Sequence, residues 1–276
     1  MAITAADVNK LRKQTGAGMM DCKKALVETD GDFEAAIDVL RKKGQKIAAK
    51  RGENETKEGV IFAQATADGK SGVVLSLSCE TDFVAKNDDF RGFVQSLVKI
   101  AIEKMPSSKE ELMALAYDSK LSVSDKIIEH VGVVGEKLDL SGYETIVADK
   151  VVAYNHPGNQ LATLVGLNSG SDSAEDAGKQ VAMQVAAMNP LALNKEGIDA
   201  DTIARELEVG KDLAIQEGKP ADMAEKIAEG RLGKFFKDNT LLSQPFVRDN
   251  KLSVEDFLKS TEAGLTIVDF KRLALG

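Results

Sequence analysis

The chain has 276 residues and a net charge of −8, with 43% of its residues hydrophobic and 29% charged. A chain of this length can bury a sizeable core and fold into two or more structural units. No stretch approaches the roughly 20 apolar residues that span a bilayer, and the N-terminus has no apolar signal core. Cys22 and Cys79 lack the spacing of a disulfide framework or a zinc site. We therefore expect a cytoplasmic protein with reduced thiols.

The charge is unevenly distributed along the chain. Residues 1–51 hold 11 lysines and arginines against 7 acidic residues, whereas residues 52–276 hold 25 against 37. An acidic body argues against a general nucleic-acid binder, because neutralisation of phosphates supplies most of the affinity in that class. The distribution favours a protein that docks on another protein.

Residues 1–50 are predicted to form a small domain of three helices. Thr4 is a good N-cap for the first helix, and Gly16 ends that helix. The segments GMMDCKKALVET and FEAAIDVLRKKG space their apolar residues as helices do. Residues 51–58 are polar and lack periodicity, so we interpret them as a linker.

A pattern of strands and a helix occurs twice after the linker. GVIFAQATADGKSGVVLSLSCE predicts a hairpin that turns at Asp68 and Gly69, followed by a helix that ends before Pro106. DKVVAYNHPGNQLATLVGLNS predicts a second hairpin, followed by a helix that ends before Pro190. The fold class is therefore α+β, with a pseudo-symmetric core of two copies. The first copy is expected at residues 59–140, and the second at residues 141–198 and 237–276.

Residues 199–236 interrupt the second copy with a charged, helical segment. Gly218 ends one helix there, and Pro220 begins the next. Two such helices joined by a tight turn form an antiparallel hairpin. We expect its seam to include Gly210 and Ala214 on the first helix and Met223, Ile227 and Gly230 on the second. A short helix, SVEDFLKST, and a closing strand, GLTIVDFKRLAL, are predicted to follow.

Two stretches resemble phosphate-binding loops but lack required residues. GAGMMD, residues 16–21, follows a helix rather than a strand, and Asp21 stands at the third glycine position of a dinucleotide fingerprint. Gly69-Lys70-Ser71 ends like a Walker loop, but Gln64 occupies the position of its first glycine. Neither stretch predicts a nucleotide site.

The two histidines do not form a catalytic or metal-binding group. His130 lies on the predicted helix SDKIIEHVGVV without a second ligand one turn away, and His156 lies in the turn YNHPG between two strands. No serine–histidine, cysteine–histidine or paired-acid constellation stands out. We therefore expect no enzyme, no metal site and no cofactor.

Three apolar side chains have partner binding as an alternative to burial. Phe83 lies in the polar stretch ETDFVAKNDDF, and the matching loop of the second copy, SGSDSAED, has no aromatic residue. Of the adjacent Met19 and Met20, only one can point fully inward, so we expect the other at the surface, where methionine makes adaptable contacts. Core burial stays open for these residues, and Asp82 has the alternative of capping a helix or ordering its own turn.

The run RKKGQKIAAKR, residues 41–51, contains six cationic residues. Cations are favourable at a helix C-terminus, so a solvated helix end is one interpretation. Contact with RNA or with the ribosome is the other.

Three stretches together resemble one known family. LRKQTGAGMMDCKKAL, residues 11–26, and ETDFVAKN, residues 80–87, closely resemble the two signatures of bacterial elongation factor Ts. GKPADMAEKIAEGRLGKFF followed by LLSQPFV resembles the coiled-coil hairpin of that family and its return to the core. The resemblance covers essentially the whole chain and implies a UBA-like N-terminal domain. Some members continue into a C-terminal helical module, whose partner contacts are not expected here.

The resemblance also implies a function. Members of the family are not enzymes: they exchange GDP for GTP on elongation factor Tu, the GTPase that delivers aminoacyl-tRNA to the ribosome. One segment is then implied to insert beside the nucleotide site of the partner and to dislodge its magnesium ion: Thr81, Asp82, Phe83 and Val84. Three further residues are implied to touch the partner: Met19, Met20 and His156. No direct contact with nucleic acid or a membrane is implied, and a homodimer or a 2:2 complex stays open.

Two other function classes remain as alternatives. One is an RNA-binding or ribosome-binding translation protein that uses residues 41–51, although the acidic body argues against it. The other is a structural or chaperone-like adaptor that binds through residues 199–236. The adaptor would keep its partner after loss of Phe83 but not after loss of the hairpin.

Overall fold

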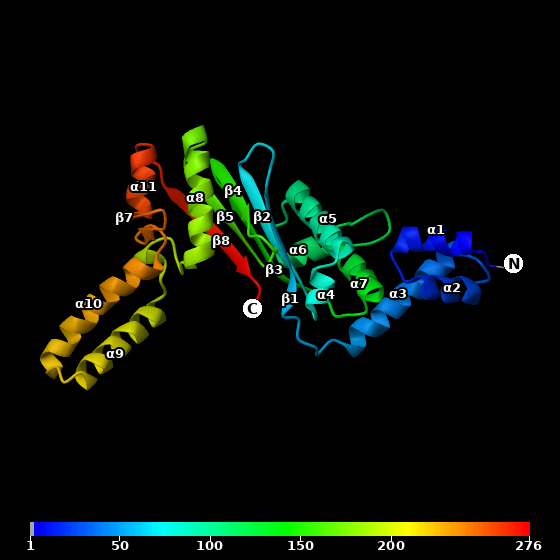
Figure 1. Ribbon diagram of the computed structural model, residues 1–276, viewed down its shortest axis with the longest axis horizontal. Coiled ribbons are helices and arrows are strands. Elements are labelled where there is room, and N and C mark those ends of the chain that lie inside the picture. Colours follow the sequence, from blue (N-terminus) through cyan, green and yellow to red (C-terminus); the bar gives the residue numbers. More distant parts are fainter. Residues whose placement is uncertain (1–2) are drawn as a thin grey trace.

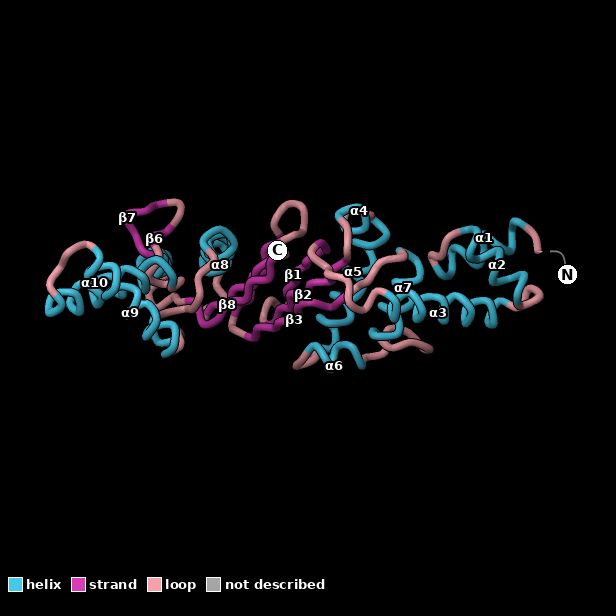
Figure 2. Tube along the Cα trace, turned by 90° about the horizontal axis from the view of Figure 1, so that it is seen from below, coloured by secondary structure: helices cyan, strands magenta, loops and turns pink. Residues whose placement is uncertain are grey.

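The computed structural model describes residues 3–276 as an elongated molecule. The N-terminal helices lie at one end, two small sheets lie in the middle, and a helical hairpin projects at the other end (Figure 1). The view turned by 90° shows the same order along the long axis (Figure 2). The prediction of an α+β fold is confirmed.

The N-terminal domain contains three helices, as expected: α1 (Ala5–Thr15), α2 (Met19–Glu28) and α3 (Phe33–Lys50). Thr4 and Asp7 form a capping box at the start of α1, and Gly16, with φ 71°, ends that helix. Leu11, Cys22 and Leu26 are fully buried between the helices. The capping and the apolar spacing of the sequence therefore determine the local structure here.

The core holds two three-stranded antiparallel sheets with the same strand order. The first consists of β1 (Glu58–Ala65), β2 (Ser71–Cys79) and β3 (Asp139–Val147), and the second of β4 (Lys150–Asn155), β5 (Leu161–Leu167) and β8 (Ile267–Ala274). In both sheets the third strand pairs with the middle one. The register shifts at equivalent places, between Ser76 and Leu77 and between Gly166 and Leu167. Two related copies are therefore present.

Strand β3 crosses the boundary that the sequence predicts between residues 140 and 141. It pairs with β2 from Ser78–Asp139 to Ser71–Val147, so residues 141–147 belong to the first sheet. The strand has a weak sequence pattern because β3 is an edge strand with few buried side chains. Only Leu140 and Ile146 of this strand are fully enclosed.

A long helix covers the outer face of each sheet, α5 (Asp88–Lys104) on the first and α8 (Asp172–Met188) on the second (Figure 1). Each helix is capped by a left-handed residue that precedes a proline, Met105 with φ 47° and Asn189 with φ 44°. The inner faces pack on each other through a separate apolar cluster that includes Ile61 and Leu164. The core therefore has four layers: helix, sheet, sheet and helix.

Each copy carries an insertion between its long helix and its third strand. The first copy has α6 (Lys109–Ala114) and α7 (Val123–Val134) there. The second copy has a longer insertion: η1 (Lys195–Gly197), α9 (Ala200–Gln216), α10 (Ala221–Asn239), β6 (Pro245–Phe246), β7 (Asp249–Ser253) and α11 (Val254–Thr261). The predicted helical hairpin is formed by α9 and α10.

The seam of the hairpin is made of small residues. The buried residues are Gly210 and Ala214 on α9 and Ala224 and Ala228 on α10. A Cβ atom on Gly210 would lie 3.2 Å from the Cα atom of Ala228, so the two backbones nearly touch. The expectation that Met223 and Gly230 belong to the seam is wrong: both are exposed. Such close packing selects alanine and glycine instead.

A second close helix crossing joins the N-terminal domain to the core. Gly44 on α3 faces Gly132 on α7, and a Cβ atom on Gly44 would lie 2.6 Å from the carbonyl oxygen of Ile128. This atom belongs to the backbone, so it cannot rotate away as a side chain could. The crossing therefore fixes where the N-terminal domain sits.

Gly44→Ala should loosen this docking. The added methyl group forces α3 and α7 apart, and overpacking of this kind typically costs about 1–3 kcal/mol. We expect a lower midpoint of urea unfolding and faster proteolysis of the linker at residues 51–58. Gly230→Ala is the matched control: nothing lies within 4 Å of its added Cβ atom, and the better helix propensity of alanine should stabilise α10 by up to about 1 kcal/mol. An equal urea midpoint and an equal rate of linker proteolysis in the two variants would contradict the role of the Gly44–Gly132 crossing in docking the N-terminal domain.

Candidate functional site

A single helical turn, α4 (Asp82–Ala85), is inserted between β2 and α5. The first copy uses residues 80–87 for this connection, whereas the second copy joins β5 to α8 with residues 168–171 alone. The repeat therefore does not require α4. Its position comes from the contacts that residues 80–87 make with the rest of the chain.

The turn directs one large apolar side chain into solvent. Ala85 is buried, and Val84 packs against the core of the first copy. Phe83 points the other way, with 83% of its surface exposed. Asp82 forms an ion pair of 2.7 Å with Lys86 one turn later, and the hydrogen bond from Lys86 holds the pKa of Asp82 below its ordinary value. Burial of Phe83 within its own core is therefore excluded.

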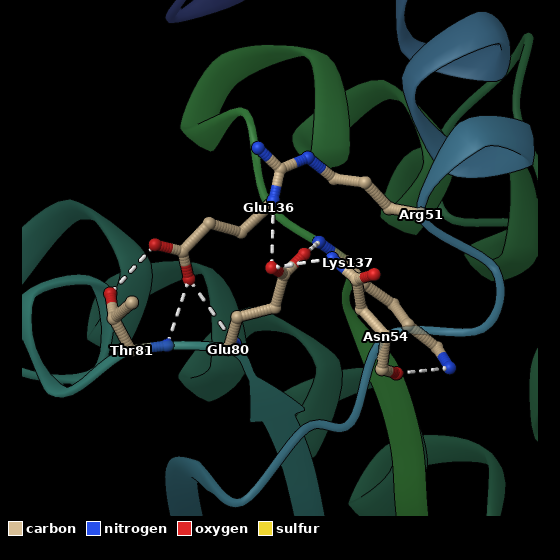
Figure 3. A network of polar contacts seen from close by, with 6 residues as sticks. All are labelled: Arg51, Asn54, Glu80, Thr81, Glu136 and Lys137. Carbon is tan, nitrogen blue, oxygen red and sulfur yellow. Dashed lines mark hydrogen bonds and ion pairs between the residues drawn. The ribbon is translucent and has the colours of Figure 1, made fainter.

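The entry to α4 is held by a carboxylate from a distant loop. Glu136 follows α7, and its Oε2 atom accepts hydrogen bonds from the backbone N–H groups of Glu80, at 3.2 Å, and Thr81, at 3.0 Å. Thr81 Oγ1 donates to Glu136 Oε1 at 2.6 Å (Figure 3). Thr81 occupies the N-cap position of α4, yet its hydroxyl does not cap the helix. Within this chain the hydroxyl binds Glu136 instead.

Glu80 joins the same region to the linker. Its carboxylate, 14% exposed, accepts from Arg51 NH1 at 2.7 Å, from Asn54 Nδ2 at 2.9 Å and from the backbone N–H of Lys137 at 2.6 Å (Figure 3). Burial acts to raise the pKa of Glu80, but the hydrogen bonds from Lys137, Asn54 and Arg51 together hold it below its ordinary value. Lys137 Nζ also donates to two linker carbonyls. We call the six residues of Figure 3 the hinge network: Arg51, Asn54, Glu80, Thr81, Glu136 and Lys137.

An open groove of about 610 Å³ separates the N-terminal domain from α4. Its lining comes from both sides and includes Gly16, Gly18, Met19, Phe83, Phe90 and Val133. The groove therefore brings together two side chains that are 64 residues apart in the sequence, Met19 and Phe83. Met20 and His156 are not among the described residues that line this groove.

Both adjacent methionines are exposed, Met19 at 53% and Met20 at 62%. The expectation that one of them points inward is wrong. Met19 begins α2, and the inward positions of this helix are occupied by Cys22, Ala25 and Leu26. These three residues fill the space, so both methionines reach the solvent.

The two histidines lie in different surroundings. His130 stacks on Phe93, with ring centroids 4.1 Å apart, and it is one of the residues that line the groove. His156 is exposed in the β4–β5 turn, with its Nδ1 atom 3.0 Å from Tyr154 Oη. Hydrogen bonds of 2.8 and 2.9 Å between the side chain of Asn155 and the backbone of Ala63 brace this turn against β1.

No group within residues 3–276 has the chemistry of a metal centre or a reactive thiol. No cluster of three metal-ligating side chains occurs in this range. Cys22 and Cys79 are free and buried, and burial raises the pKa of both thiols, that of Cys79 to about 12.

Comparison with known proteins identifies the family of this chain. The family model described as "Elongation factor TS" matches residues 80–276. The elongation factor Ts of Christiangramia forsetii is 54% identical over 99% of both chains. The chain belongs to the elongation factor Ts family. The elongation factors Ts of Flavobacterium psychrophilum, at 52% identity over 99% of both chains, and Amoebophilus asiaticus, at 51% over the full length of both, are similar relatives. Across residues 3–276, no helix of this family member is both long and apolar enough to cross a membrane.

Sequence patterns did not indicate the roles of four residues that hold residues 80–87 in place. Glu80 lies within the predicted signature, but the pattern indicates no structural role for it. Glu136 and Lys137 follow the glycine that ends α7, and Asn54 lies in a polar linker. Asn54, Glu136 and Lys137 lie outside any periodic pattern or motif, because their importance depends on long-range contacts.

His130 gives the fold a dependence on pH. Burial, with a smaller contribution from Lys126, lowers its pKa from 6.5 to about 4. The unfolded chain therefore binds the proton more readily than the folded chain. Above pH 6.5 this group does not reduce the free energy of unfolding, and as the pH falls from 6.5 towards about 4 it reduces that free energy progressively. His130→Phe removes the titrating group and should flatten this part of the stability curve, measured by urea unfolding. An unchanged acid slope in the variant would show that His130 does not cause it.

Proposed function

We propose that this chain promotes the release of GDP from elongation factor Tu, so that GTP can bind. Membership of the elongation factor Ts family implies a nucleotide exchange factor of translation elongation. The observation that carries the finer proposal is Phe83, 83% exposed on a turn that is held on both sides. We infer that Phe83 enters the partner beside its nucleotide site, with Thr81, Asp82 and Val84 forming the segment that presents it.

The expected mechanism is displacement of a magnesium ion by a wedge. A GTPase holds GDP through a phosphate-binding loop and Mg²⁺, and the ion is the largest local charge. A side chain that moves the flanking elements weakens both contacts. Linkage then requires that GDP weakens the binding of the exchange factor by the same ratio by which the factor weakens GDP binding. Such a factor accelerates exchange without making or breaking a covalent bond.

The groove supports a second contact on the partner. Met19 and Phe83 line it from opposite sides, so one element of elongation factor Tu could touch both. Met20 lies next to Met19 and is also exposed. His156, on the β4–β5 turn of the core, is proposed as a separate contact. An apolar anchor surrounded by polar residues is a common arrangement at interfaces.

The alternative of RNA binding through residues 41–51 has weaker support. Three of the six cationic side chains form ion pairs within the chain: Arg41 with Asp38, Lys43 with Asp21, and Arg51 with Glu80. These pairs reduce the charge available for phosphates. Retention of RNA with a steep dependence on salt would favour this alternative.

The hairpin has its own proposed role in self-association. Several apolar side chains on it are about half exposed: Val209, Leu213, Ile215 and Met223. A homodimer or a 2:2 complex with the partner would cover them. Sedimentation of the free protein and of the complex would distinguish these states from a monomer.

Phe83→Ala should reduce exchange without unfolding the protein. Because the side chain is 83% exposed, its removal should leave the melting temperature nearly unchanged. Loss of an interface anchor costs about 2 kcal/mol or more, which corresponds to about thirtyfold in rate. The measurement is release of fluorescent GDP from elongation factor Tu.

Val147→Ala is the matched control, since Val147 is a 74% exposed apolar residue outside the groove. It should leave exchange unchanged. A large loss of stability in Phe83→Ala, or full exchange activity, would refute the wedge.

Replacement of residues 199–236 by a short Gly/Ser linker should leave a folded and active protein. The chain on either side of the hairpin is already joined, because the N–H of Leu241 lies 2.9 Å from the carbonyl of Ala192 and that of Leu191 lies 2.8 Å from the carbonyl of Asn239. Closing the shorter loop therefore costs little. Exchange should fall less than in Phe83→Ala. If the deletion variant keeps its melting transition but loses all exchange activity, the hairpin and not the Phe83 segment makes the active contact.

A further inference from the structure

Three hydrogen-bond donors at the entry to α4 converge on one carboxylate. Glu136 accepts from two backbone N–H groups and one hydroxyl, at 3.2, 3.0 and 2.6 Å. It reaches Glu80 and Thr81 from the loop between α7 and β3 (Figure 3). We propose that Glu136 is the positioning residue of the Phe83 segment. It fixes the angle at which the chain leaves β2, and thereby the direction in which Phe83 projects.

The turn cannot hold this direction by itself. An isolated helical turn is unfavourable, because it fixes several backbone dihedrals for one hydrogen bond. The first residues of α4 have no side-chain cap, and the exposed ring of Phe83 contributes little packing. The C-terminal side of α4 is anchored by Val84 and Ala85 in the core. Glu136 supplies the anchor on the other side.

The second copy contains a comparable carboxylate without a wedge. Glu262 follows α11 shortly before β8, as Glu136 follows α7 shortly before β3. Glu262 accepts from the hydroxyl groups of Ser169 and Ser171, in the loop between β5 and α8, and from that of Ser173 in the first turn of α8. A glutamate before the third strand therefore closes this loop in both copies. Only in the first copy does it bind the backbone of an added turn.

Glu80 extends the effect of Glu136 to the linker. The backbone N–H of Glu80 binds Glu136, while its side chain binds Arg51 and Asn54. The backbone and the side chain of one residue therefore hold both the start of α4 and the chain that leads to the N-terminal domain. Loss of Glu136 should disturb the relative placement of Phe83 and Met19 across the groove.

This inference rests on the proposed exchange function, and two variants separate geometry from charge. Glu136→Ala leaves three donors without their acceptor. Glu136→Gln keeps a carbonyl oxygen that can accept both backbone N–H groups, and its NH₂ group can donate to the hydroxyl of Thr81. A role in positioning therefore predicts loss of function in the alanine variant and rescue in the glutamine variant.

The first test is the dependence of GDP release on the concentration of the exchange factor. Glu136→Ala should lower the maximal rate about tenfold, as expected for loss of hydrogen bonds to a charged group, and should change the half-saturating concentration less. Glu136→Gln should restore most of the rate. Glu262→Ala is the matched control, and its rate should equal that of the wild type. Equal rates for Glu136→Ala and the wild type, or equal losses in the two alanine variants, would overturn the proposal.

The second test does not depend on exchange activity. Amide hydrogen exchange of residues 80–87 should be faster in Glu136→Ala than in the wild type, in Glu136→Gln or in Glu262→Ala. Unchanged protection in Glu136→Ala would show that the carboxylate does not hold α4. If Glu136→Ala fails to fold, Thr81→Val removes one of the three donors at nearly constant volume, and Thr81→Ser restores it. Slower GDP release in Thr81→Val that Thr81→Ser does not rescue would also overturn the proposal.

These tests distinguish the two hypotheses. If the wild type does not accelerate GDP release at all, the proposed function is wrong, and amide exchange alone decides whether Glu136 holds α4. If the wild type is active and Phe83→Ala is inactive, while Glu136→Ala is fully active, the exchange function stands and the positioning role is wrong.

Discussion

Phe83 remains in water because the residues on both sides of it are fixed by other contacts. Full burial of such a side chain would stabilise a fold by roughly 1.5–3 kcal/mol, and this contribution is largely absent at 83% exposure. A flexible loop would let the ring collapse onto the nearest apolar surface. The carboxylate of Glu136 at the start of the turn, and Ala85 buried at its end, prevent this collapse. The remaining architecture supplies these two anchors.

The repeated core explains how such a segment can exist without disrupting the fold. Each copy packs its sheet against one long helix and against the other sheet, so the connection between middle strand and helix lies at the edge of this packing. In the second copy the connection is short and bonded to Glu262 through serines. In the first copy it is longer and bonded to Glu136 through the backbone. The same topological position thus holds a simple loop in one copy and the proposed contact segment in the other.

Much of this arrangement could be predicted from the sequence, and the exceptions have physical causes. Caps and apolar spacing located the helices of the N-terminal domain, and the repeated hairpins located both sheets. The predicted boundary between the two copies at residue 140 was wrong, because β3 is an edge strand with a weak pattern of apolar residues. The prediction that one of Met19 and Met20 points inward was wrong, because Cys22, Ala25 and Leu26 already fill the inward face of α2. Glu136 could not be found at all, since its partners lie 55 and 56 residues away.

The glycine crossing and the hinge network together constrain the proposed contact surface before any partner arrives. Gly44 and Gly132 set the distance between α3 and α7, and Arg51 and Asn54 tie the linker to Glu80. A flexible surface would lose free energy on binding, because each ordered side chain and loop costs entropy. A constrained one avoids that cost, so under the proposed function more of its interaction with the GTPase is available to distort the nucleotide site. For an exchange factor this matters more than affinity, since a factor that binds the nucleotide-bound and empty partner equally well shifts nothing.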